Sequence, residues 1–244
     1  GCPLSTATCS ATFMASALGH IASRVLGPRL GLPAAGLASG FVSSTATIAA
    51  MGSRAASEPR LTLPAAAAAV MSSVSTTVQL PLVLAAISPS VLRALAVPLL
   101  LACLAAVAYA VAFALASLRS SVPEESDPGP SFSVKTAIIL AATISGVVLL
   151  SAGCEAWLGR SGVVMAAILS GFADTHAAAV SVASLEVSGR LDASGAVVPI
   201  LAAFSANTVS KVVVAVLSGG WRFAMRIVPG LVFMLAAAWF GLFL

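Results

Sequence analysis

The sequence has few charged residues. Only 8% of its 244 residues are charged and 6% are aromatic, whereas about 25% of the residues of a typical soluble domain are charged. A soluble chain of this size needs more charge to cover its surface, so an ordinary cytosolic enzyme is excluded. The net charge of +4 comes from twelve Lys and Arg that are scattered singly. No basic cluster exists to follow a phosphate backbone, so we expect no nucleic-acid partner.

Catalytic and metal-binding motifs are also lacking. The four cysteines form no CxxC pair and have no histidine at ligand spacing, which is typical of free thiols that pack as small apolar groups. No GxSxG, HExxH, P-loop or dinucleotide-binding pattern occurs in a suitable context. We therefore expect neither an enzyme nor a cofactor. The cysteines are Cys2, Cys9, Cys103 and Cys154.

Apolar residues are abundant. They make up 59% of the chain, and the mean hydropathy is +1.08. The apolar stretches lack the period-2 alternation of strands and are rich in Ala and Leu, which favour helices. Because a spanning helix needs about 20 apolar residues, the sequence predicts an all-α membrane protein with eight spanning helices. The predicted spans are 5–26, 31–54, 62–87, 90–117, 133–158, 161–186, 193–218 and 221–244. Turn residues or charges predict breaks between them, among others at Glu58–Arg60, Ser88–Ser90 and Ser218–Gly220.

The sequence repeats itself at an offset of 131 residues. Over residues 29–53 the shifted chain shows 8 identities in 25, including a shared Ser-Gly-Phe, and later Thr-Val and Val-Pro pairs keep the register. Constant offset over such a length indicates an internal duplication. We predict a first four-helix repeat over 1–117, a polar linker over 118–132 and a second four-helix repeat over 133–244.

The number of crossings decides how the two repeats are oriented. With four spans in each copy, both copies have the same orientation and are related by an axis along the membrane normal. If one helix of each copy is re-entrant, each copy has three spans and the repeats become inverted. Both Ser-Gly-Phe sites, Ser39–Phe41 and Ser170–Phe172, lie inside a predicted helix that they could break.

Polar residues occur at the same two places in both repeats. The second repeat carries Asp174, Thr175 and His176 in its second span and Asn207, Thr208 and Lys211 in its third. The equivalent positions of the first repeat are neutral. We predict that these segments face each other across the repeat interface and bind an ion or small solute. The candidate residues of the first repeat are Ser43, Ser44, Thr45, Thr76, Thr77 and Gln79.

Ionisable residues inside a span are costly and therefore indicate function. Asp174 and Lys211 are expected to pair, which lowers the cost of both charges. His176 changes charge near neutral pH and suits proton coupling or gating. Asp174 is the candidate metal ligand, but in one helix Asp174 and His176 would point in different directions, so they should not form a two-ligand site alone. The alternative is an Asp174–Lys211 ion pair that only holds the bundle together.

Several of these segments resemble a known family. The sequence is similar to an uncharacterised bacterial membrane domain that is often found C-terminal to an MgtC/SapB module. The resemblance implies a multi-pass protein of the bacterial inner membrane that is associated with magnesium homeostasis, and it makes an MgtC/SapB-type domain a candidate partner. It rests on Gly19–Ile21, Leu26–Arg29, Gly36–Ala46, Ser170–Asp174 and Ala206–Lys211.

These observations favour a transporter or channel for a small inorganic ion. A divalent cation such as magnesium is the first hypothesis, with proton coupling as a further element. Lys211 argues against a simple cation cage and, with Asn207, suits an anion or a proton-coupled step. The alternative is a membrane protein that does not transport but regulates or scaffolds a partner. Small-residue faces are also compatible with a homodimer.

Overall fold

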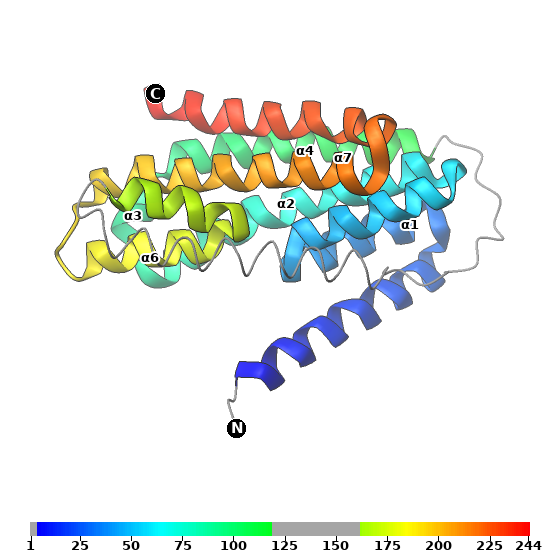
Figure 1. The fold of residues 1–244 in the computed structure, drawn as a ribbon, viewed down its shortest axis with the longest axis horizontal. Coiled ribbons are helices and arrows are strands. Elements are labelled where there is room, and N and C mark those ends of the chain that lie inside the picture. Colours follow the sequence, from blue (N-terminus) through cyan, green and yellow to red (C-terminus); the bar gives the residue numbers. More distant parts are fainter. Residues whose placement is uncertain (1–3, 119–161) are drawn as a thin grey trace. The chain divides into compact units, whose positions relative to one another are not determined.

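A computed structural model describes the backbone of residues 4–118 and 162–244, and the side chains of residues 31–117 and 162–244. Every regular element in these ranges is a helix (Figure 1). The predicted linker and the predicted span 133–158 lie outside the described residues. The elements are α1 (Leu4–Ser57), η1 (Pro59–Leu61), α2 (Thr62–Ile87), α3 (Pro89–Ala94), α4 (Ala96–Leu118), a helix over Gly162–Ala173, α6 (Thr175–Val187), α7 (Ala193–Phe240) and η2 (Gly241–Phe243).

Contacts divide the chain into two compact units, which we describe separately. The first unit comprises Gly1–Thr76, Ala106–Ser133 and Val214–Gly230. The second unit comprises Thr77–Ala105, Val134–Val213 and Leu231–Leu244. The two units are assembled from segments of both predicted repeats, and the repeat boundaries themselves stay a prediction.

The helix predicted over 62–87 is confirmed by α2, which has the same bounds. Helix α2 starts just after the break predicted at Glu58-Pro59. The short helix η1 lies at this break. The end of α2 is fixed by Ser88, which has an extended backbone and whose Oγ accepts a hydrogen bond from the backbone N of Val91 at 3.2 Å. This is an N-cap for α3, and Pro89 occupies the first turn, where a missing N–H costs nothing.

Helix α1 is helical along its whole length but is not straight. In the first unit, Gly36 packs on Ala68 and Gly40 on Ser72, and a Cβ added at Gly40 would lie 2.6 Å from the Ser72 Cα. Farther along, Thr76 Oγ1 donates a hydrogen bond to Ser44 Oγ at 2.9 Å. Each pair has the same sequence separation, so this part of α1 runs parallel to α2.

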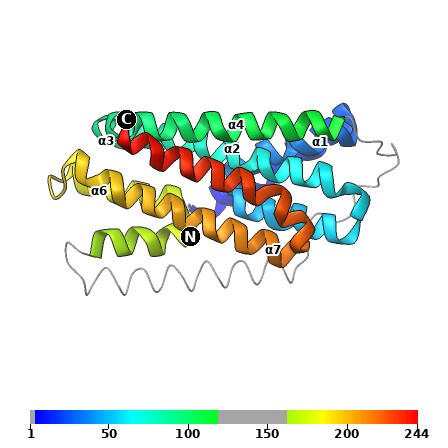
Figure 2. The ribbon, with the colours of Figure 1, turned by 90° about the horizontal axis from the view of Figure 1, so that it is seen from above.

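A straight α1 could not then connect to α2. Ser57 would lie about 20 Å beyond Ser44, while Thr62 lies about 21 Å on the other side of Thr76. Residues 58–61 span at most about 18 Å. Therefore α1 turns back after Ser44, as its ribbon does in Figures 1 and 2. The segment predicted as a span over 31–54 lies within Gly31–Ser57, which is long and apolar enough to cross a membrane. Its end returns to the start of α2, so the segment is folded as a helical hairpin.

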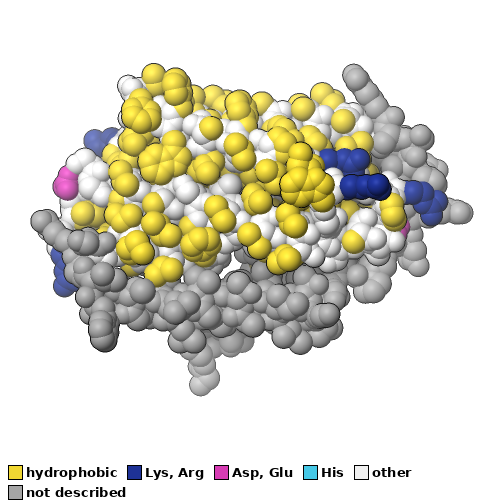
Figure 3. Space-filling view, turned by 45° about the horizontal axis from the view of Figure 1, so that its top comes forward, with side chains coloured by type: hydrophobic (Ala, Val, Ile, Leu, Met, Phe, Trp, Pro, Cys, Tyr) yellow, Lys and Arg dark blue, Asp and Glu magenta, His cyan; other side chains and the backbone are white. Residues whose placement is uncertain are grey.

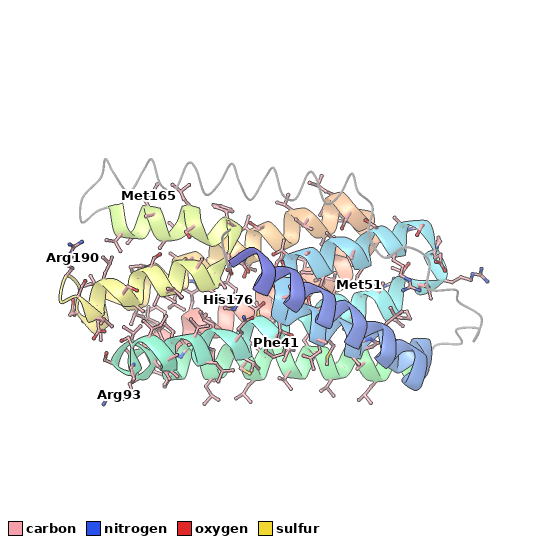
Figure 4. The ribbon with its side chains drawn as sticks, turned by 90° about the horizontal axis from the view of Figure 1, so that it is seen from below. Phe41, Met51, Arg93, Met165, His176 and Arg190 are labelled. Carbon is pink, nitrogen blue, oxygen red and sulfur yellow. The ribbon has the colours of Figure 1, made fainter. Side chains whose placement is uncertain are left out.

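The single continuous helix predicted over 161–186 is wrong. The helix over Gly162–Ala173 ends at Asp174, whose backbone is extended (φ −156°, ψ 121°), and α6 begins at Thr175. In Figure 4 the chain runs from Met165 to His176 and then back to Arg190, so this segment is a second hairpin. The side chain of Asp174 makes the reversal possible because it caps the new helix.

The predicted break at Ser218–Gly220 is confirmed inside α7. Gly220 has φ 70° and ψ 179°, a left-handed backbone that only glycine adopts without strain. The ribbon reverses there in Figure 1. In the second unit, Trp239 Nε1 donates to Ser205 Oγ at 3.0 Å, which ties the two limbs of α7 together.

Four of the described helical segments are long and apolar enough to cross a membrane: Gly31–Ser57, Pro59–Ile87, Ala96–Ser117 and Ala193–Phe243. Large apolar side chains are exposed along them, including Leu100, Leu104 and Phe233, each more than half exposed. Hydrophobic side chains cover much of the face drawn in Figure 3, where charged groups are few. The chain is therefore consistent with a membrane protein, as the sequence predicts.

A hydrogen-bonded carboxylate, here called the latch, holds the end of the second hairpin that lies opposite its tip. Near the end of α6, Glu186 accepts hydrogen bonds from Ser90 Oγ at 2.6 Å and from Ser88 Oγ at 2.7 Å. These two hydroxyls hold the pKa of Glu186 below its ordinary value. The latch therefore ties α6 to the junction of α2 and α3 when Glu186 is ionised.

We expect this latch to weaken in acid. Its contribution is complete above the pKa of an unfolded glutamate, about 4.3, and is lost as the pH falls through the lowered pKa of Glu186. The Glu186→Gln variant should melt at a lower temperature than the wild type at neutral pH, and the gap should close in acid. Thermal unfolding of both proteins against pH checks this. Glu58→Gln is the control, because Glu58 makes no side-chain cap bond. A gap that is constant with pH would contradict the prediction.

Candidate functional site

The second hairpin is fixed against the first limb of α7 by two contacts. Gly171 lies so close to Ala203 that an added Cβ would be 2.6 Å from the Ala203 Cα. One residue later, the carbonyl oxygen of Phe172 accepts a hydrogen bond from Ser210 Oγ at 2.8 Å. A helix end leaves carbonyls without partners, and Ser210 satisfies one of them. The tip of the hairpin is thereby held beside the middle of α7.

Asp174 and His176 interact directly at this tip. Asp174 Oδ1 accepts from the backbone N of His176 at 2.9 Å and lies 2.9 Å from His176 Nδ1. The expectation that the two side chains point apart is wrong, because it assumed one continuous helix. With the backbone extended at Asp174, its carboxylate turns towards the first turn of α6. The side chain of Asp174 is 52% exposed and that of His176 is 18% exposed.

Lys211 is the buried charge of the site. Its side chain is 0% exposed, and it interacts electrostatically with Asp174. On α7, Asn207 and Lys211 lie one turn apart on the face that includes Ala203 and Ser210. Since Ala203 and Ser210 both contact the hairpin, this face of α7 is turned towards the tip. The structure thus brings the predicted Asp174, His176 and Lys211 together within one unit.

Two buried polar atoms at the tip have no hydrogen-bond partner. They are Thr175 Oγ1 and His176 Nε2. Thr175 is 1% exposed. Asn207, a residue of the predicted site on α7, is also buried. Buried polar groups normally have partners because leaving one unpaired costs about 1–3 kcal/mol. These two atoms mark the tip as a place where a ligand can be held.

The neutral residues of the first hairpin form a hydroxyl cluster. Ser43 Oγ accepts from the backbone N of Ala46 at 3.2 Å, which is a capping bond at the position equivalent to Asp174. Ser44 Oγ accepts the hydrogen bond from Thr76 Oγ1 described above. Ser75 Oγ donates a hydrogen bond to the carbonyl oxygen of Leu37 at 2.6 Å. Both hairpins therefore carry a capping side chain at their tip.

The remaining predicted residues have ordinary surroundings. Thr45 and Thr77 are buried, and Gln79 is half-buried. Thr208 Oγ1 donates back to the carbonyl of Phe204 at 2.9 Å, which is a common bond for threonine inside a helix. The prediction that the two clusters face each other across a repeat interface stays a prediction.

The tip is poor in metal ligands. Within residues 31–117 and 162–244, no group of three or more His, Cys, Asp and Glu side chains is placed to hold a metal ion. Asp174 contributes one carboxylate, and Lys211 adds a positive charge near it. The assignment of Asp174 as a metal ligand stays a prediction.

Reasoning from the sequence missed Ser210 and the close packing at Gly171. Ser210 adjoins Lys211, but a serine inside an apolar helix is common and gives no distinctive signal. The shared Ser-Gly-Phe was predicted as a place where each helix could break. The glycine of each motif lets the hairpin approach the backbone of the following helix, which the sequence alone does not specify.

Comparison with known proteins places the chain in a family. Residues 13–219 match the family described as "Domain of unknown function (DUF4010)". Because the match covers most of the chain, the protein belongs to this family. No curated protein and no solved structure matches the chain.

Proposed function

We propose that the protein is a membrane transporter or channel for a small inorganic ion, which binds at the tip of the second hairpin. The observation that carries the proposal is the helix break at Asp174 beside the fully buried Lys211. In a membrane, a broken helix is tolerated only where it is buried in protein or lines a cavity. Ionisable residues inside membrane segments typically mark a transport path.

The predicted duplication supports this function. The helix that follows the hairpin starts at Thr62 in one copy and at Ala193 in the other, which is the predicted offset of 131. In both copies the glycine of the Ser-Gly-Phe motif packs on that helix at the same separation. If the hairpins do not cross, each copy has an odd number of crossings and the two repeats are inverted. Inverted repeats with discontinuous helices near the membrane midplane are typical of secondary transporters.

The family resemblance supports three further proposals. It implies a bacterial inner membrane as the location, a divalent cation such as magnesium as the ion, and an MgtC/SapB-type domain as a partner. The half-exposed carboxylate of Asp174 is the described group at the tip that could bind a cation. Lys211 opposes this, because its ammonium group repels a cation nearby.

Flux through the purified full-length protein tests the proposal. Proteoliposomes should be screened for Mg²⁺, other divalent cations, protons and small anions, with empty liposomes as the control. We expect a saturable flux of at least one of these ions. If protein that is shown to be folded moves none of them, the transport proposal is wrong.

The second candidate is a membrane protein that regulates or scaffolds a partner. The structural role of Asp174 favours this candidate, because Asp174 caps α6 and interacts with Lys211. A double variant, Asp174→Asn with Lys211→Met, separates the two functions, because it removes both charges and keeps an oxygen that can cap α6. A purely structural ion pair should tolerate the joint removal of both charges and keep its function, whereas a transport site should not.

A further inference from the structure

The charged side chains described in the first unit lie near one of its ends. Gly52, in the returning arm of the first hairpin, packs on the break of α7, because an added Cβ would lie 2.9 Å from the backbone N of Gly219. The end of α1 and η1 therefore lie near the start of the second limb of α7. The charged side chains of these segments are one acid and four arginines: Glu58, Arg54, Arg60, Arg222 and Arg226.

Two of these arginines form a pair on the second limb of α7. Arg222 is exposed and Arg226 is half-buried. Residues four apart lie on the same side of a helix, with their Cβ atoms about 5–6 Å apart. On the inner side of the limb, Phe223 and Ile227 are fully buried. Tyr109 Oη on α4 also donates a hydrogen bond to the carbonyl oxygen of Arg226 at 3.0 Å, so the backbone that carries the pair is held in place.

The arginine pair has no acidic partner among the side chains that the structure describes, where the ion pair found joins His176 to Asp174. Like charges one turn apart repel each other and weaken a helix. An anion between the two guanidinium groups relieves this repulsion and accepts charge-assisted hydrogen bonds from both. A phosphate group suits the pair best, because its oxygens match the planar fork of a guanidinium group.

Exposed apolar side chains lie next to the arginine pair. Trp221 is 69% exposed and Met225 is 48% exposed, and these two residues are also one turn apart, so they form a row beside the arginines. Tryptophan is enriched where a membrane meets water, because its ring is largely apolar and carries a polar N–H. A phosphate that is joined to acyl chains covers both rows, whereas a free phosphate leaves the apolar row uncovered.

We propose that Arg222 and Arg226 bind the phosphate of one anionic phospholipid, whose acyl chains lie along Trp221 and Met225. The surplus of arginines at this end of the unit attracts an anionic headgroup more strongly than a zwitterionic one. The lipid site belongs to the first unit and the proposed ion site to the second. The proposal therefore goes beyond ion transport and does not depend on it.

Thermal unfolding of the solubilised full-length protein tests the lipid site. Delipidated protein in a nonionic detergent receives phosphatidylglycerol, phosphatidylcholine with the same acyl chains, or glycerol phosphate, which carries the phosphate without acyl chains. We expect phosphatidylglycerol to raise the melting temperature in a saturable way and the other two compounds to have little effect. Arg222→Gln and Arg226→Gln should each weaken the apparent affinity for phosphatidylglycerol about fivefold, which corresponds to about 1 kcal/mol.

Arg190→Gln is the matched control. Arg190 is exposed in the second unit and has no basic residue one turn away, so its variant loses the same charge without breaking a pair. We expect it to keep the wild-type affinity for phosphatidylglycerol. If it weakens the affinity as much as Arg222→Gln, the attraction is a diffuse charge effect and the proposed site is wrong.

The compounds give further outcomes that decide the proposal. Equal stabilisation by phosphatidylglycerol and phosphatidylcholine overturns the anionic lipid site. Equal stabilisation by glycerol phosphate identifies a site for free phosphate and also overturns it. If the glutamine variants do not fold, a double variant, Arg222→Lys with Arg226→Lys, keeps both charges and loses the planar forks. It should bind phosphatidylglycerol more weakly than the wild type, and an unchanged affinity would contradict the bonding proposed for the phosphate.

Discussion

Replacing Asp174 by Asn should reduce ion flux at least about tenfold, an effect equivalent to about 1.4 kcal/mol, while the protein stays folded. The amide oxygen of Asn still accepts the backbone N–H of His176, so the cap of α6 is retained. The negative charge beside Lys211 is lost, and with it the balance of charges on which ion binding depends. Flux into proteoliposomes, measured beside the melting temperature, checks the prediction.

Asp192→Asn is the matched control for this variant. Asp192 also caps a helix, since it accepts from the backbone N of Gly195 at 3.3 Å at the start of α7. It lies in the connecting loop, away from Lys211. Its variant should keep the wild-type flux. Equal losses in both variants would mean that the cap matters and the charge does not, which contradicts the role proposed for Asp174.

Replacing Gly40 or Gly171 by Ala should destabilise the protein by about 1–2 kcal/mol in each case. A Cβ at either position would lie 2.6 Å from a Cα of the facing helix, and backbone atoms cannot move aside without shifting the hairpin. Overpacking of this kind costs about 1–3 kcal/mol, occasionally more. The gain in helix propensity from Gly to Ala, about 1 kcal/mol, offsets only part of it. Unfolding in denaturant measures both variants.

Gly195→Ala provides the comparison. There the nearest atoms belong to the side chains of Asp192 and Leu191, which can rotate away. We expect a loss of less than about 1 kcal/mol. If Gly40→Ala and Gly171→Ala prove no more harmful than Gly195→Ala, the two hairpins are not packed as described.

Much of the helical pattern was predictable from the sequence. Long apolar stretches predicted helices, four of which are long and apolar enough to cross a membrane, and α2 has the predicted bounds. Glycine and proline gave the breaks at Glu58–Arg60, Ser88–Ser90 and Ser218–Gly220, because left-handed backbone and missing N–H groups end helices locally. Such signals depend on a few neighbouring residues and can be recognised without the tertiary fold.

The hairpins could be anticipated only as an alternative. Hydropathy counts apolar residues along the chain and does not register that a helix reverses after Ser44 or at Asp174. The reversal depends on contacts with residues more than thirty positions away, such as Ser72 and Ala203. The same holds for the site. The ionisable residues were identifiable because charge is rare in spans, but the Asp174–His176 bond requires the extended backbone at Asp174.

The hairpin at Asp174 is tested most directly by one distance. Spin labels at Met165→Cys and Val187→Cys, in a full-length chain whose native cysteines are replaced, report the separation between the two arms in lipid. A hairpin places the labels less than about 20 Å apart, because packed helix axes are about 8–10 Å apart and both labels lie on the same side of the tip. A continuous spanning helix separates them by about 33 Å. The shorter distance is expected, and the longer one would contradict the hairpin and the site built on it.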